Sequence, residues 1–87
     1  MIKKFEELIC KSIKVDKINI IDRSNQHAGH QGYTSGMHLE ALIVSDDFIG
    51  KSLIERHRLV YAALSDFMNK EIHALSMKTL TKEEINK

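Results

Sequence analysis

Five histidines are the side chains of this protein best suited to bind a metal. Three of them fall in one polar, glycine-spaced stretch, "NQHAGHQGYTSGMH" at residues 25–38, and the other two are His57 and His73. Imidazole is the commonest metal ligand in proteins. His27 and His30 lie beside glycines, outside any apolar pattern, so they are candidate ligands; the alternative is an ordinary surface position.

A metal site made from this chain alone would lack ligands. Structural zinc takes four nitrogen or sulfur ligands, usually with some thiolate, and an ordinary iron–sulfur cluster takes four cysteines. The chain has one cysteine, Cys10. We therefore expect a partner to supply the missing ligands and the isolated chain to hold no cofactor. Cys10 flanks an apolar stripe and is expected to be buried, with partial exposure as the alternative.

Composition indicates one ordinary globular domain spanning residues 1–87. The formal net charge is +1, and 43% of residues are hydrophobic. Such a small charge argues against strong binding to nucleic acid through phosphate contacts. A single cysteine, no leader-like start and no membrane-length apolar run favour a reducing compartment, the cytoplasm or a reducing organelle. We expect a monomer or weak homodimer with no membrane association.

Hydrophobic periodicity predicts an α+β fold with a three-stranded sheet. Helical spacing of apolar residues covers 2–14 and 52–69, and strand-like runs cover 17–24, 37–45 and 72–80. Asp46 or Asp47 is expected to cap backbone donors in the turn "DDFIG". Thr81 and Glu84 have capping-box spacing, which predicts a short final helix in "TKEEINK". The element order is α-β-β-α-β-α.

The long helix contains "RHR" at residues 56–58. His57 falls within the apolar stripe, so we expect a core or boundary histidine with a hydrogen-bond partner. Arg56 and Arg58 are expected on a solvated face, and phosphate contact together with Lys51 is the alternative. The predicted apolar face of this helix is Leu53, Val60, Tyr61, Leu64, Phe67 and Met68.

His38 and His73 each stand at the beginning of a predicted strand. His38 is expected to support the loop or the strand structurally. For His73, in "EIHAL", the sequence leaves a structural and a functional role equally open.

The segments "VSDDFIGKSLIERHRLVYAAL" (44–64) and "IHALSMKTLT" (72–81) resemble the signature of BolA-like proteins, F-x-G-x-x-x-x-x-R-H-R-x-V-Y followed by an H-A-L strand. The loop "HAGH" with a histidine-led strand is similar to the histidine-loop branch of that family. The resemblance covers nearly the whole chain and implies a type II KH-like fold with a mixed sheet. The tail departs from the pattern by lacking a proline and an aromatic residue. The matching residues are Phe48, Gly50, Arg56, His57, Arg58, Val60, Tyr61, His73, Ala74 and Leu75.

The resemblance also implies a partner and a cofactor. BolA-like proteins pair with monothiol glutaredoxins and share a bridging 2Fe-2S cluster. The glutaredoxin contributes its active-site cysteine and a bound glutathione contributes a second thiol. On this side the implied ligands are His73 and one loop histidine, His27 in preference to His30, with His38 in a supporting position.

The rival interpretation is a DNA-binding transcription regulator using the KH-like fold, with Lys51, Arg56 and Arg58 at phosphates. The sequence "GKSL" is not the G-x-x-G loop with which KH domains clamp a backbone, and the near-neutral charge predicts weak binding. No nucleophile and base occur at recognisable spacing, so we do not expect an enzyme.

Overall fold

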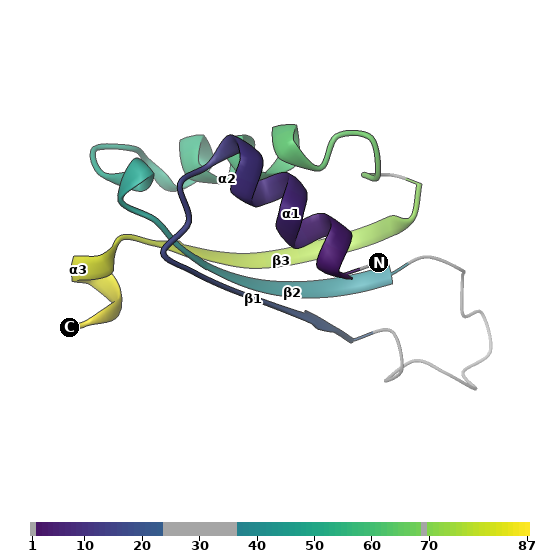
Figure 1. Cartoon of the computed structure of the whole chain (residues 1–87), viewed down its shortest axis with the longest axis horizontal. Coiled ribbons are helices and arrows are strands. Elements are labelled where there is room, and N and C mark those ends of the chain that lie inside the picture. Colours follow the sequence, from purple (N-terminus) through teal and green to yellow (C-terminus); the bar gives the residue numbers. More distant parts are fainter. Residues whose placement is uncertain (1, 24–36, 69) are drawn as a thin grey trace.

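The computed structural model describes residues 2–23, 37–68 and 70–87 (Figure 1). The predicted order of elements is confirmed. Within this described part, no helix has the length and apolar character needed to cross a membrane. The elements are α1 (Ile2–Ser12), β1 (Lys17–Asp22), β2 (Met37–Val44), the 3-10 helix η2 (Asp46–Phe48), α2 (Leu53–Ala63), β3 (Ile72–Leu80) and α3 (Lys82–Ile85).

The sheet is mixed, with the strand order β1-β2-β3. β1 pairs antiparallel with β2, and β2 pairs parallel with β3. A parallel pair needs a crossover connection, which here contains α2. The α+β class, the three strands and the mixed pairing all agree with the sequence expectation.

The helices α1 and α2 cover one face of the sheet (Figure 1). Alternate residues of the central strand enter the core between these layers, as the period of two in a strand requires. Phe67, after α2, packs edge-on against Phe5 of α1 with ring centroids 5.1 Å apart. The buried core consists of Phe5, Ile9, Ile13, Ile20, Leu39, Ala41, Ile43, Phe48, Val60, Leu64 and Ile72.

The turn after β2 is fixed by side chains that satisfy backbone donors; this role was predicted for Asp46 or Asp47, and both aspartates have it. Asp47 accepts from the Lys14 amide at 2.8 Å, and Asp46 accepts from the Lys82 amide at 3.2 Å. Gly50 follows with φ 78°, a left-handed conformation that favours glycine. These contacts join the α1–β1 turn, η2 and the start of α3.

Three expectations about the helices were wrong. α2 ends at Ala63 rather than near residue 69, because the chain then turns back toward β3. Its first residue, Leu53, is 61% exposed and Tyr61 is 39% exposed, so the buried face is narrower than predicted. Cys10 is exposed, because Phe5 and Ile9 direct the α1 stripe to the core and Cys10 lies about 100° further around the helix.

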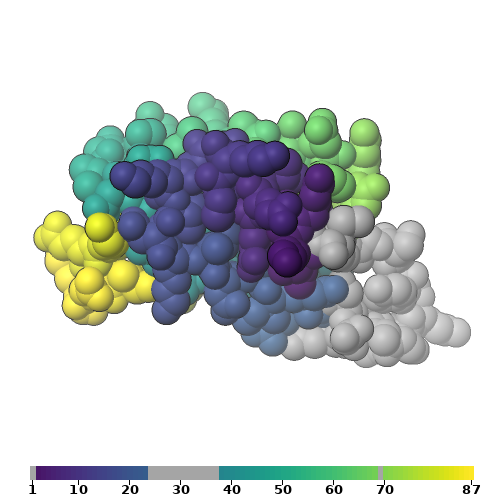
Figure 2. Space-filling view, viewed as in Figure 1, coloured from purple at the N-terminus to yellow at the C-terminus, as the bar shows by residue number. Residues whose placement is uncertain are grey.

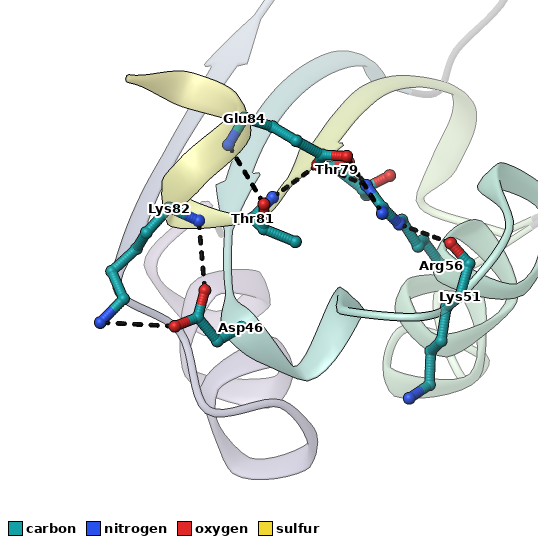
Figure 3. A network of polar contacts seen from close by, with 7 residues as sticks. All are labelled: Asp46, Lys51, Arg56, Thr79, Thr81, Lys82 and Glu84. Atoms are coloured by element: carbon teal, nitrogen blue, oxygen red, sulfur yellow. Dashed lines mark hydrogen bonds and ion pairs between the residues drawn. The ribbon is translucent and has the colours of Figure 1, made fainter. Parts of the chain in front are cut away.

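Arg56 was expected on a solvated face, and this was also wrong. Its side chain is 12% exposed. Its guanidinium links α2 to the turn before α2, to β3 and to α3 (Figure 3). It donates to the carbonyls of Lys51 at 3.0 Å and Thr79 at 2.9 Å, and to both Glu84 carboxylate oxygens at 2.7 and 3.3 Å. The guanidinium carbon also lies 5.8 Å from the ring centroid of Phe48.

The same carboxylate belongs to the predicted capping box of α3, which is confirmed. Thr81 donates its amide to Glu84 at 2.8 Å and accepts from the Glu84 amide at 3.2 Å. Hydrogen bonds from Arg56, assisted by those from Thr81, lower the pKa of Glu84 from 4.5 to about 2. The Glu84 carboxylate is therefore ionised when it anchors α3.

Glu84→Gln tests this anchor through its pH dependence. Because the pKa of Glu84 is lower in the folded chain, its stabilising contribution is present above pH 4.5 and is lost as the pH falls toward 2. We expect the wild-type protein to melt at a higher temperature than the variant at pH 7, with the difference shrinking over that window. Thermal melts from pH 7 to 2 measure it.

Glu83→Gln is the matched control, because it removes the same charge from a carboxylate that makes no bond to Arg56. Its effect at pH 7 should be smaller. An unchanged gap between wild type and Glu84→Gln down to pH 2 would contradict the assignment.

Candidate metal centre

The parallel pairing of β2 and β3 brings their first residues to the same end of the sheet. Met37 pairs with Ile72, but His38 pairs with Ala74, so the register shifts by one residue at this point. His73 is therefore the extra residue of a bulge. A bulge interrupts the ladder and re-aims a side chain, and such irregularities are frequent beside functional sites.

His38 and His73 lie next to each other at this bulge. Their ring centroids are 5.2 Å apart and the ring planes differ by 34°. With metal–nitrogen bonds of about 2.0 Å, two imidazoles on one tetrahedral centre have ring centroids about 5 Å apart. His73 is exposed and His38 is half-buried. The pair thus places two imidazole rings side by side, with His73 at the surface and His38 behind it.

Sequence reasoning placed His38 in a supporting role and missed how close its ring lies to His73. The available signal was topological: two strands that each begin with a histidine and run parallel must place those histidines together. The bulge, which decides the separation of the rings, has no signature in the sequence.

His27 and His30, the predicted loop ligands, lie outside the described residues. The described chain on either side of them is anchored at the His38–His73 end. The Arg23 amide donates to the His38 carbonyl at 2.7 Å, and the Arg23 guanidinium pairs with Glu40 at 3.0 Å. Both attachment points of the 24–36 segment therefore belong to the same end of the sheet as His73.

Among the described residues, no group of three or more histidine, cysteine, aspartate or glutamate side chains could hold a metal ion. This part of the chain thus offers two imidazoles at one place. A tetrahedral iron or zinc needs four ligands, so a centre here requires donors from elsewhere.

The three cations considered for nucleic-acid contact do not form a free basic patch. Arg56 is committed to contacts inside the chain, and Lys51 donates to the Asp47 carbonyl at 2.9 Å. Arg58 is exposed on α2. The same helix also exposes two apolar side chains, Leu53 at 61% and Ile54 at 64%.

Comparison with known proteins agrees with the resemblance seen in the sequence. A family model described as BolA-like protein matches residues 9–84. The chain belongs to the BolA-like family.

The BolA-like relatives of this chain include a solved structure and proteins of different length and name. The solved BolA domain of SufE1 from Arabidopsis thaliana has a TM-score of 0.79 and 41% identity, with 94% of this chain and 92% of that chain covered. SufE-like protein 1, chloroplastic/mitochondrial, of Arabidopsis thaliana is 38% identical over 88 residues, but the match spans only 24% of its length. The DNA-binding transcriptional regulator BolA of Escherichia coli (strain K12) is 29% identical over 82 residues, covering 94% of this chain and 76% of that protein.

The middle residue of the BolA-like "RHR" motif is half-buried, as expected, but the described residues do not supply a hydrogen bond to its buried ring nitrogen. The Nε2 atom of His57 is buried and has no hydrogen-bond partner among the described residues. A buried polar atom without a partner costs stability. His57 therefore stabilises the domain through packing, at some polar cost.

Two substitutions at His57 separate the contribution of its packing to stability from the cost of its unpaired nitrogen. His57→Leu keeps most of the volume and removes the unpaired nitrogen, so the free energy of unfolding should rise by about 1 kcal/mol. His57→Ala removes the packing and should lower it by about 1–2 kcal/mol. Urea denaturation measures both. A loss of stability in His57→Leu as large as that in His57→Ala would show that the ring has a polar role.

Proposed function

We propose that this BolA-like chain is an adaptor that binds a monothiol glutaredoxin and shares a 2Fe-2S cluster with it. The observation that supports the proposal is the exposed His73 at the β2–β3 bulge, with the ring of His38 beside it at a centroid distance of 5.2 Å. The role is binding and presentation of ligands, and no catalytic step is assigned to the chain.

The number of ligands that each partner can supply favours a shared cluster. His73 is the first ligand from this chain, and a loop histidine, His27 or His30, is the second, with His38 supporting His73. The glutaredoxin cysteine and a glutathione thiol complete the set. Imidazole in place of thiolate makes a cluster less negatively charged and raises its reduction potential, as in Rieske centres.

Exposure at the end of the sheet suits this role. His73 is exposed, and the bulge directs it away from the regular ladder. A partner can therefore approach the ring without any rearrangement of the core. The neighbouring His38 is held by its strand and by the Arg23–His38 backbone hydrogen bond, which gives the site one rigid wall.

His73→Ala should abolish or severely change the shared cluster while the fold and the apo heterodimer survive. The reason is that two partner thiols and one imidazole leave an iron short of a ligand. His27→Ala and His30→Ala should differ from each other, since one is a ligand. The measurement is visible absorption and circular dichroism after reconstitution of each variant with the same glutaredoxin and glutathione.

Two further variants make this series decisive. His38→Ala should perturb the cluster spectrum less than His73→Ala if His38 only supports the site; an equal loss assigns it as the second ligand. His57→Leu, at the distant α2 packing position, should leave the spectrum unchanged. A wild-type spectrum in the His73→Ala complex would refute the proposed ligation.

A second candidate function is DNA binding. It is favoured by the name of the Escherichia coli relative, a DNA-binding transcriptional regulator, and by the exposed Arg58 on α2. Arg56 is used internally and Lys51 donates to the Asp47 carbonyl, so Arg58 is the one of the three candidate cations left exposed on α2, and the net charge is only +1.

Any DNA binding should therefore be weak and fall steeply with salt. Arg58→Glu should weaken it further with the fold intact, whereas Lys4→Glu, the same charge change on α1, should have a smaller effect. Titration of duplex DNA at several salt concentrations, followed by anisotropy, provides the measurement. Sequence-specific nanomolar binding near physiological salt would instead make regulation the leading function.

A further inference from the structure

One face of the sheet carries neither α1 nor α2. Strand pairing places three ranks of residues on it: Lys17, Val44 and Leu80, then Asn19, Leu42 and Lys78, then Ile21, Glu40 and Ser76. The last two ranks, together with Leu80 and with Ile85 of α3, line an open groove of about 690 Å³. α3 forms one end of the molecule in Figure 2, at the end of the sheet where β3 finishes.

Four apolar residues of this groove lie along one diagonal of the sheet. Ile21 on β1, Leu42 on β2 and Leu80 on β3 are successive diagonal neighbours, and Ile85 of α3 continues the line. None of them belongs to the helix-side core. Diagonal neighbours in a sheet are about 7–8 Å apart, so the diagonal is about 15 Å long, or about three turns of an α-helix.

A lysine stands on each side of the diagonal, Lys17 at one side and Lys78 at the other. Among the described residues, neither ammonium group has an ion-pair or hydrogen-bond partner. The one carboxylate of the groove, Glu40, is paired with Arg23 at 3.0 Å. The face therefore presents an apolar strip between two unneutralised positive charges.

The wall of the groove is preformed. Arg56 holds Glu84 of α3 with two hydrogen bonds, and the Lys82 ammonium lies 3.5 Å from Asp46 and 3.8 Å from Asp16. Ile85 is thus kept at the end of the apolar diagonal. A ligand that binds here does not have to order α3.

We propose that this open face is a docking site for an acidic amphipathic helix of a partner protein. The helix lies along the diagonal for about three turns, its apolar stripe on Ile21, Leu42 and Leu80. Carboxylates on either side of that stripe pair with Lys17 and Lys78. A second copy of this chain fits poorly, since facing two such surfaces would bring lysines against lysines. The inference does not depend on the metal centre.

The probe is a stapled helical peptide with a leucine stripe flanked by glutamates, and its twin carries lysine at each glutamate position. The acidic peptide should bind the full chain and shift the amide NMR signals of Ile21, Leu42, Lys78 and Leu80. Lys78→Glu should weaken binding about fivefold, while Lys4→Glu, the same charge change on α1, should leave it unchanged. Lys17→Glu repeats the test from the opposite side of the diagonal.

Each other outcome overturns the proposal. These are no binding of the acidic peptide, equal binding of its lysine twin, shifts confined to α2, and binding that neither Lys17→Glu nor Lys78→Glu weakens. Self-association that shifts the same amides without peptide would assign the face to a second copy. Binding of anionic vesicles in place of the peptide would assign it to a lipid surface.

Discussion

The parallel pairing of β2 with β3 is the constraint on which the rest of this structure depends. Parallel neighbours begin at the same edge of a sheet, so His38 and His73 meet although 34 residues of chain lie between them. An antiparallel β3 would have placed His73 beside Val44, at the opposite end. The pairing also requires a crossover, and that crossover supplies α2, the second helix of the core.

Arg56 secures the crossover at the other end of the sheet. Its planar guanidinium reaches two backbone carbonyls and a carboxylate at once, which the point charge of a lysine cannot reproduce. A buried charge is tolerated only when its hydrogen bonds are satisfied, and here the partners come from the turn before α2, from β3 and from α3. The first arginine of the "RHR" motif is therefore structural, although as a sequence it has the composition of a phosphate-binding patch.

The sequence predicted what local periodicity controls. Isoleucine-rich and alternating segments identified all three strands, and Thr81 with Glu84 identified the cap of α3. The end of α2, the exposure of Leu53 and Cys10, and the burial of Arg56 depend on which part of each helix actually covers the sheet. That is decided by tertiary packing, which a helical wheel does not contain. For the candidate site, the sequence singled out His73 only through its family resemblance, and it missed the ring of His38 because a one-residue bulge sets that contact.

The placement of the helices explains where the two surfaces lie. In the part of the chain that the structure describes, α1 and α2 cover one face of the sheet, and the four-residue α3 lies at one end of the other face. The uncovered face keeps Leu42 and Ile21 accessible, and the bulge at the far end keeps His73 accessible. Neither surface contributes to the helix-side core. The residues of these surfaces can therefore be selected for binding a partner rather than for the stability of the fold. Among the described residues, the histidine end and the open groove are thus two surfaces that lie outside the helix-side core.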